Sequence, residues 1–439
     1  MHWFASLIIL LGMVCGLMGL GFPVAFAFLV TDLVGVFLFM GGERGITQLI
    51  GNMLSSVTTF TLVPVPLFIL MGELFFHTGI AIRVFDALDK CLGRLPGRLS
   101  FLTVGGGTLF AALSGSSLAN TAMMGSMMVP EMTRRGYKPV MSIGAIMGTG
   151  GLAILIPPSA LAVLLASLAR IDVGALLIAG IIPGLVLATC YVTLILLIVR
   201  LDPQAAPVYD IAQVSRWQVV RALIVDVAPM GVVVFLVVGL ILLGWATPSE
   251  SAAFGVGGVL LLAVAFRRLS WAAIVKSLDG TLRVTVMTLL IILASSTFSQ
   301  ILAFSGASSG LISWATSLDM PPWVALLVMY LTILFLGCFM DQLSIMLLTV
   351  PIFFPLAHVY GMDPIWLGII VMMGLEIGLT TPPFGLLLFI MQGVAPPGTT
   401  FAQICWAAAP FVACGVFVSV LIMVFPSIAL WLPSLIAAP

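Results

Sequence analysis

The sequence predicts an all-α polytopic membrane protein that contains an internal inverted repeat, two re-entrant hairpins and two broken helices. Of its 439 residues, 62% are hydrophobic and only 7% are charged, whereas soluble domains carry about 25% charged residues. Apolar stretches of about 20 residues, each long enough to cross a bilayer as a helix, recur along the chain. The alternating ten-residue strands of a membrane barrel do not occur in the sequence.

The sixteen Lys and Arg residues predict the topology, because positively charged loops remain in the cytoplasm. Four clusters are placed there, at 83–98, 134–138, 200–221 and 267–283. The N-terminus is then extracytoplasmic. Its apolar run has no preceding Lys or Arg and no cleavage site, so we interpret it as a first membrane helix rather than a signal peptide.

This orientation assigns every apolar segment. Membrane spans are expected at 3–22, 24–40, 60–79, 140–170, 174–199, 222–244, 250–266, 284–304, 365–395 and 402–432. The segments 99–130 and 325–356 enter and leave on one side, and are therefore expected to be re-entrant hairpins. Arg44 and Arg170 fall on the outer side, each with an acidic residue beside it. The alternating charges of 83–98 indicate an amphipathic helix on the cytoplasmic surface, with its charges solvated.

An internal repeat relates the two halves of the chain at an offset of 225 residues. The matched positions are Pro96, Pro130, Gly136, Pro139, Pro157 and Pro158 with Pro321, Pro355, Gly361, Pro364, Pro382 and Pro383. Five predicted spans separate the loop 131–139 from its copy 357–364, so the second copy is inverted. The first loop holds three basic residues and its copy no Lys or Arg. Inverted repeats are typical of secondary transporters; an old duplication in a channel or scaffold is the alternative.

Each repeat carries a double proline in the middle of a predicted span, within GTGGLAILIPPS (148–159) and GLEIGLTTPPFG (374–385). Proline removes a backbone donor and clashes with the preceding turn, and carbonyl groups freed in hydrocarbon need new partners. A cation is one such partner. The hydroxyl groups of Thr149, Ser159, Thr380 and Thr381 are available as further oxygen ligands. A simple proline kink is the alternative.

The expected hairpin tips, SGSSLANT (114–121) and GCFMDQLS (337–344), are polar. Helix ends at the bilayer midplane offer N–H groups to anions and carbonyl groups to cations. Close packing through small residues is the alternative, but it explains Asn120 and Asp341 less well. Asp341 and Glu376 are acids without a basic neighbour in the sequence, which indicates an ion or proton path or, alternatively, an arginine partner from the first half. His77 and His358 are interpreted as interface histidines.

Motifs of several enzyme classes do not occur in this sequence. It has no GxxxxGK[ST] loop and no HExxH motif. Its three histidines offer no pair for a haem, and its six cysteines are scattered without a CxxC pair. The net charge of zero gives no indication of nucleic-acid binding. The protein is therefore not expected to be an enzyme.

Two long motifs resemble a known family. SGSSLANTAMMGSMMVPEMTRRGY and GLEIGLTTPPFGLLLFIMQGVA resemble the signatures of the large membrane subunit of tripartite ATP-independent periplasmic (TRAP) transporters, the DctM/SiaM-like family. The resemblance covers nearly the whole chain. Gly374 and Leu387 stand where the family pattern has asparagine, a departure that affects any polar contact made from those positions.

The resemblance implies an elevator-type transporter of the bacterial cell inner membrane. The implied division is N-terminal scaffold helices in 1–60, a scaffold helix and amphipathic arm in 61–98, transport-domain repeats in 99–173 and 324–400, scaffold helices and a second arm in 174–323, and a C-terminal membrane helix in 401–439. Several sodium ions, and no organic cofactor, would drive import of a small carboxylate such as a C4-dicarboxylate or sialic acid. A periplasmic substrate-binding protein would deliver it, and a separate small four-helix membrane subunit would pack on the scaffold.

The resemblance also implies site residues. The sodium-binding candidates are Ser114, Ser116, Ser117, Asn120, Thr149, Gly150, Asp341, Gly378, Thr380 and Thr381. The substrate-binding candidates are Ser116, Asn120, Ser159, Thr381 and Pro382. Two alternatives remain at this point: a self-sufficient divalent-anion/sodium symporter without a binding protein, and a non-transporting membrane scaffold.

Overall fold

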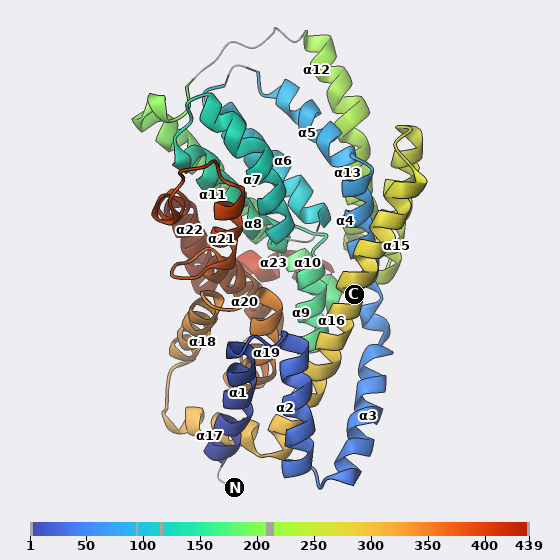
Figure 1. Cartoon of the computed structure of the whole chain (residues 1–439), viewed down its shortest axis with the longest axis vertical. Helices are drawn as coiled ribbons and strands as arrows, with labels where there is room; N and C mark the ends of the chain where they lie inside the picture. Colours follow the sequence, from blue (N-terminus) through green and yellow to red (C-terminus); the bar gives the residue numbers. More distant parts are fainter. Residues whose placement is uncertain (1–2, 94, 115–116, 208–214, 437–439) are drawn as a thin grey trace.

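A computed structural model of the chain describes residues 3–93, 95–114, 117–207 and 215–436, without the side chains of 56, 57, 61, 111–114 and 119. The described residues form helices joined by turns, with no strand among them. Figure 1 shows an elongated bundle, with α5 and α12 near one end and α1, α2, α3 and α17 near the other. The all-α fold predicted from the sequence is confirmed.

The N-terminal helices pack on a long helix from the middle of the chain. They are α1 (Trp3–Gly19), α2 (Val24–Phe39) and α3 (Glu43–Val57), and α2 and α3 both contact α16 (Trp271–Phe304). The sequence predicted α1 and α2 but not α3, because α3 is amphipathic, with apolar residues every three or four positions. The 34-residue α16 joins a basic segment and a span that were predicted separately, since no proline interrupts 271–304.

The next helices lead into the first hairpin. A 3₁₀ turn (Phe60–Leu62) precedes α4 (Pro64–His77), and α5 (Ile80–Cys91) bends away from α4 by 66°. The amphipathic helix predicted at 83–98 corresponds to α5, which ends at Cys91, and Arg98 instead begins the next helix. Two arginines of the predicted segment are paired rather than simply solvated. Arg83 pairs with Asp226, and Arg98 lies 2.5 Å from Asp89 and is 5% exposed.

Two helical hairpins and two broken helices form the repeat. The hairpins are α6 (Arg98–Ser114) with α7 (Ser117–Arg134), and α18 (Pro322–Gly337) with α19 (Gln342–Val359). The broken helices are α8 (Ala145–Leu155) with α9 (Ala160–Ala169), preceded by a π-helical turn (Val140–Gly144), and α20 (Pro364–Leu379) with α21 (Leu386–Val394). Adding 225 to the bounds of α7 gives the bounds of α19, and adding it to the last residue of α9 gives that of α21.

The two repeats interlock. In each repeat the first arm of the hairpin packs on the first half of the broken helix, α6 on α8 and α18 on α20. The second half of each broken helix packs on the hairpin of the other repeat, α9 on α19 and α21 on α7. The hairpins predicted at 99–130 and 325–356 and the breaks predicted at the double prolines are thus present, and each hairpin packs on broken helices of both repeats.

The remaining helices surround these elements. They are α10 (Val173–Ala179), α11 (Ile181–Leu201), the 3₁₀ turn Pro203–Ala205, α12 (Arg216–Ala222), α13 (Ala228–Val234) and α14 (Leu240–Leu242) with π-helical turns at Leu223–Val227 and Phe235–Gly239, α15 (Pro248–Ala265), α17 (Ala307–Ser317), α22 (Phe401–Val424) and α23 (Ser427–Ile436). The span predicted at 402–432 ends at Val424, because Pro426 cannot continue the helix.

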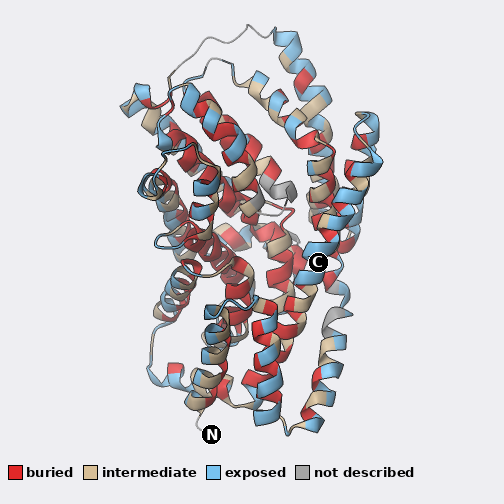
Figure 2. Ribbon diagram, viewed as in Figure 1, coloured by how far each residue is buried: buried red, intermediate tan, exposed pale blue. Residues whose placement is uncertain are grey.

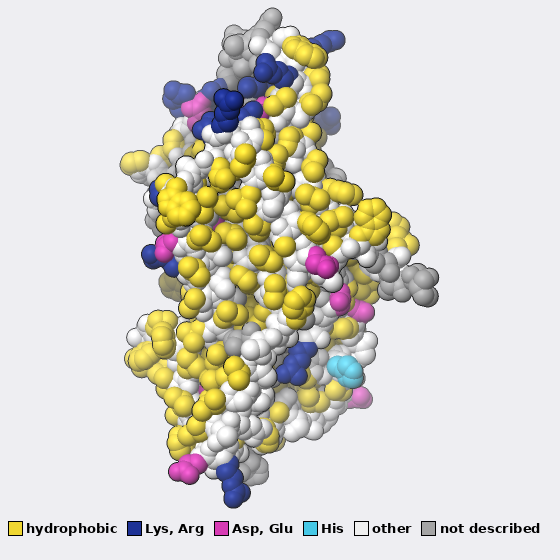
Figure 3. All heavy atoms as spheres, turned by 90° about the vertical axis from the view of Figure 1, so that its right-hand side faces the viewer, with side chains coloured by type: hydrophobic (Ala, Val, Ile, Leu, Met, Phe, Trp, Pro, Cys, Tyr) yellow, Lys and Arg dark blue, Asp and Glu magenta, His cyan; other side chains and the backbone are white. Residues whose placement is uncertain are grey.

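Burial and charge agree with a membrane protein. All of α8 is buried, as is α20 from Trp366 onward, and Figure 2 shows buried residues concentrated where the repeats meet. Figure 3 shows apolar side chains over the flank of the molecule and most of the visible Lys and Arg at the α12 end. Among the residues that the structure describes, six helices are long and apolar enough to cross a membrane, or up to eight if each bent pair counts as one span.

Candidate functional site

One buried carboxylate joins the two hairpin tips. Glu376 on α20 is 3% exposed, and its Oε2 accepts hydrogen bonds from Ser117 Oγ at 2.8 Å and from Gln342 Nε2 at 2.7 Å. Ser117 and Gln342 are the first residues of α7 and α19, and 342 − 117 = 225, the repeat offset. The two tips therefore bind the same oxygen atom from equivalent positions.

Two glycines of the first repeat, Gly150 and Gly151 on α8, lie against the Glu376 side chain. Its counterpart at the repeat offset is Gly151, and a Cβ atom built on the neighbouring Gly150 would lie 2.0 Å from Glu376 Oε1. The first repeat thus supplies space and the second supplies the carboxylate. The arginine partner considered for Glu376 is wrong for the described part of the chain, where its partners are the neutral Ser117 and Gln342.

Two buried side-chain oxygen atoms at this site, one on Asn120 and one on Glu376 itself, lack a hydrogen-bond donor among the described residues. Asn120 Nδ2 donates to Thr149 Oγ1 at 2.9 Å, and Thr149 Oγ1 donates to the Ile146 carbonyl at 2.6 Å. Neither Asn120 Oδ1 nor Glu376 Oε1 has a hydrogen-bond partner among the described residues. Such atoms cost about 1–3 kcal/mol each when left unpaired. Asn120 contacts Thr149 and Glu376 lies against the next residue, Gly150. Unpaired acceptors of this kind fit a cation better than an anion.

At the break between α20 and α21, two threonine hydroxyl groups lie at the C-terminal end of α20. Thr380 Oγ1 and Thr381 Oγ1 donate to the Ile377 carbonyl at 2.9 and 2.6 Å. The Gly378 carbonyl accepts the Thr381 N–H at 3.1 Å. A Cβ atom on Gly378 would lie 2.8 Å from Gly337 Cα, so this glycine lets α20 approach α18. The threonine oxygens keep lone pairs that can face a ligand.

Asp341 and Ser159 are helix caps. Asp341 accepts the Leu343 and Ser344 N–H groups at 3.0 and 3.3 Å at the start of α19, and Ser159 accepts the Ala162 N–H at 3.3 Å at the start of α9. The Pro382 carbonyl lies 3.4 Å from Cys338 Sγ.

Ser116 and the side chain of Ser114, both candidate ligands, lie outside the described residues.

A cavity of about 950 Å³ separates the tips from α4 and α16. Asp341 and Gln342 line it on the side of the tips, and Glu73 and His77 line it on the side of α4. None of its described lining residues is Lys or Arg. Gln342 belongs both to the cavity wall and to the Glu376 hydrogen bonds, so a ligand in the cavity lies next to the buried carboxylate.

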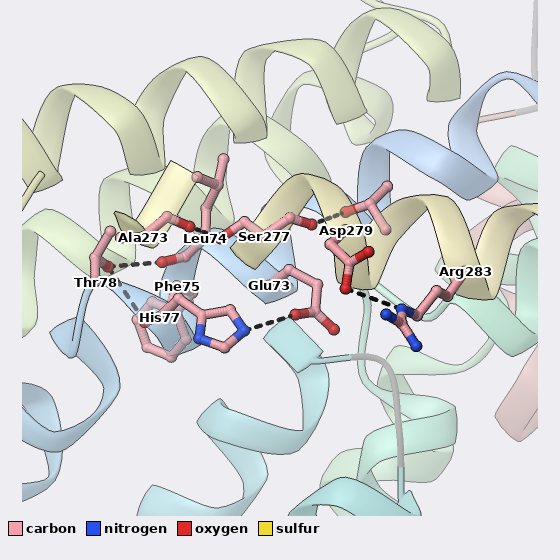
Figure 4. Close-up of polar contacts among 10 residues, drawn as sticks. Glu73, Leu74, Phe75, His77, Thr78, Ala273, Ser277, Asp279 and Arg283 are labelled. Atoms are coloured by element: carbon pink, nitrogen blue, oxygen red, sulfur yellow. Dashed lines mark hydrogen bonds and ion pairs between the residues drawn. The ribbon is translucent and has the colours of Figure 1, made fainter. Parts of the chain in front are cut away.

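Glu73 and His77 form a pair that the sequence analysis did not assign. Figure 4 shows Glu73 and the His77 ring on α4 beside α16, and their nearest atoms are 3.2 Å apart. Gly280 of α16 makes room for the carboxylate, since a Cβ atom there would lie 2.6 Å from Glu73 Oε2. His77, interpreted from the sequence as an interface histidine, lines the cavity. Glu73, like Asp341, is an acid within an apolar span, and this pattern could have marked it as a candidate site residue.

Comparisons with known proteins agree with this architecture. The family model described as "Tripartite ATP-independent periplasmic transporter, DctM component" matches residues 11–428. The chain is 34% identical over 379 residues to the C4-dicarboxylate TRAP transporter large permease protein DctM of Pseudomonas aeruginosa, covering 85% of this chain and 86% of that one. It is 29% identical over 421 residues to the sialic acid TRAP transporter large permease protein SiaM of Vibrio cholerae, covering 96% of each.

The fold is similar to that of a solved membrane transporter, Neisseria gonorrhoeae MtrF, with a TM-score of 0.63 at 14% identity over 87% of this chain and 84% of that chain. At this identity the likeness concerns the fold alone. The match to the family model over nearly the whole chain and the identity with DctM carry the assignment. The protein is a multi-pass inner-membrane protein that belongs to the DctM family of TRAP transporter large permeases.

Proposed function

We propose that this permease imports a small organic acid by sodium-coupled transport. The observation that carries the proposal is a pair of buried oxygen atoms without donors, Glu376 Oε1 and Asn120 Oδ1, on residues that contact the adjacent Gly150 and Thr149 of α8. A sodium ion there would satisfy both acceptors and neutralise the Glu376 carboxylate. Ser117, Thr149 and Gly150 stand beside it, and the second break offers the hydroxyl groups of its threonines.

The substrate is proposed to bind in the cavity at the tips. Relatives are named for C4-dicarboxylate and sialic acid, and a small carboxylate fits within about 950 Å³. The described lining includes Asp341 and Glu73 and no Lys or Arg, so bound cations would offset the negative charge before an anion entered. Gln342, which donates to Glu376, would link cation binding to substrate binding.

The movement is proposed to be of the elevator type. The hairpins and broken helices interlock with each other, whereas the cavity separates the tips from α4 and α16. This arrangement suits a moving body that carries the site along a fixed wall. The division into transport domain and scaffold given above stays a prediction. A periplasmic binding protein and a small membrane subunit complete the proposed transporter, as the family name implies.

Thermal unfolding in sodium, compared with potassium and choline at equal ionic strength, tests the cation site. A ligand present at one hundred times its Kd stabilises the folded state by about 2.7 kcal/mol, so a saturable, sodium-specific rise is expected. Asn120→Ala should abolish it. Thr133→Ala is the matched control on α7, since this residue is exposed near the other end of the helix and does not line the cavity. If neither the chain nor its complex with the small subunit shows a sodium-specific rise, sodium coupling is wrong.

A further inference from the structure

A second pocket, of about 500 Å³, lies between the end of α9 and the outer half of α16. Its wall is rich in hydroxyl groups, and it shares no lining residue with the cavity at the tips. The polar residues that line it are Ser55, Thr59, Ser167, Arg170, Ser295, Ser296 and Ser299. The predicted topology places this pocket on the outer side, away from the basic clusters.

Arg170 is the charged residue of the described lining. The adjacent acid is not its partner, because Asp172 accepts the Ala175 N–H at 2.6 Å and caps α10. Among the described residues, nothing forms an ion pair or hydrogen bond with the Arg170 guanidinium, nor with the hydroxyl groups of Ser295 and Ser299. Three side chains with unused donors therefore line one pocket.

The backbone at position 170 is a second, independent observation. Arg170 ends α9 with a φ of 56°, in the left-handed region that glycine adopts freely and that costs other residues roughly 1–2 kcal/mol. Glycine is the usual residue at such a helix end. A long cationic side chain stands here instead, beside a pocket whose described lining contains no Asp or Glu.

We propose that this pocket binds a carboxylate on the outer side of the membrane, at a site separate from the cavity at the hairpin tips. A guanidinium binds a carboxylate through two parallel hydrogen bonds, and the serine hydroxyl groups donate to its remaining lone pairs. The positive charge of Arg170 is opposite to the charge of Asp341 and Glu73, which line the cavity at the tips. The inference rests on the proposed function only in identifying the anion as the transported organic acid.

The proposal can be tested without a transport assay, by measuring how fast a cysteine introduced into the pocket reacts with charged thiol reagents. Ser299→Cys is treated with an anionic and with a cationic methanethiosulfonate, and peptide mass spectrometry reads modification at position 299. One charge about 7 Å away in water changes each rate roughly threefold, in opposite directions. The anionic-to-cationic ratio should therefore fall roughly tenfold when Arg170→Gln is added, and Arg170→Lys should restore most of it.

Two controls accompany the measurement. Arg44→Gln removes another exposed arginine, one that does not line the pocket, and should leave the ratio unchanged. Cys15, which is exposed, should keep its own ratio in every variant. Succinate, used as the carboxylate probe, should slow the anionic reagent at position 299, and chloride at equal ionic strength should not. An unchanged ratio in Arg170→Gln, or no protection by succinate, overturns the proposal, whether or not sodium drives transport.

Discussion

Replacing Gly150 by alanine tests the packing of the Glu376 carboxylate against α8. The added Cβ atom would lie 2.0 Å from Glu376 Oε1, 3.2 Å from Glu376 Cδ and 3.4 Å from Ser117 Cβ. Non-bonded heavy atoms normally stay about 3.5 Å apart, so the carboxylate must withdraw by more than about 1 Å. That movement weakens the hydrogen bonds from Ser117 and Gln342, the contacts that hold the tips to α20.

The expected cost follows from these contacts. Overpacking a tight core costs about 1–3 kcal/mol, and a hydrogen bond to a charged group contributes about 1.5–3 kcal/mol. Alanine offsets part of this, because it favours a helix by about 1 kcal/mol over glycine. We expect Gly150→Ala to lower the free energy of unfolding by about 1–3 kcal/mol and to weaken the sodium-dependent stabilisation.

The adjacent Gly151→Ala is the matched control. Its Cβ atom would meet Leu187 Cδ2 at 3.3 Å, Tyr191 Oη at 3.5 Å and Glu376 Cγ at 3.7 Å, contacts that small side-chain shifts relieve. The helix preference for alanine should then make this variant neutral or slightly stabilised. Thermal unfolding of both purified variants, with and without sodium, measures the difference. In a Glu376→Ala background, Gly150→Ala should lose its cost. Equal effects of Gly150→Ala and Gly151→Ala would refute the assigned position of the carboxylate.

Three further changes test other parts of the site and fold. Asp341→Asn should keep stability within about 0.5 kcal/mol, because asparagine caps a helix as well as aspartate, yet reduce the sodium-dependent thermal shift; an unchanged shift would exclude the Asp341 charge from the cation site. Gly378→Ala, with a Cβ atom 2.8 Å from the backbone of α18, should destabilise the protein by about 1–3 kcal/mol, whereas Gly393→Ala, with nothing within 4 Å, should not. The hydrogen bond from Lys138 lowers the pKa of the Asp202 carboxyl, so its stabilisation is present above the unfolded pKa of about 4 and is lost as pH falls through the lower folded value; Asp202→Asn should flatten the acid limb of an unfolding-versus-pH profile.

The irregular parts of the fold could be predicted because they interrupt otherwise uniform apolar spans. The double prolines ended α8 and α20 within the predicted segments, and the polar clusters marked both hairpin turns. The offset of 225 residues related the two units before any geometry was known. It also related Ser117 to Gln342, which was the available clue that both could reach one partner.

The remaining features depended on packing. Hydropathy cannot show an amphipathic helix such as α3 as a span, nor show that α16 continues through its basic end. Sequence spacing does not reveal which buried acid lies against which glycine, so Gly150 was assigned as a ligand and not recognised as the space for Glu376 Oε1. The position of His77 on the cavity wall likewise follows from the way α4 faces α16, which no local pattern encodes.

The difference between the two repeats is what makes a single shared charge possible. If both repeats carried a glutamate at this position, two carboxylates would face each other in a buried site, where like charges repel strongly. Gly151 in place of a second glutamate avoids that repulsion, while Ser117 and Gln342 preserve the symmetric contacts to one oxygen atom. In the proposed mechanism a sodium ion at the other oxygen would fix the position of Glu376, and thereby of both tips at once. Because Gln342 also lines the cavity, the cation that orders the tips would at the same time shape the wall that the substrate meets.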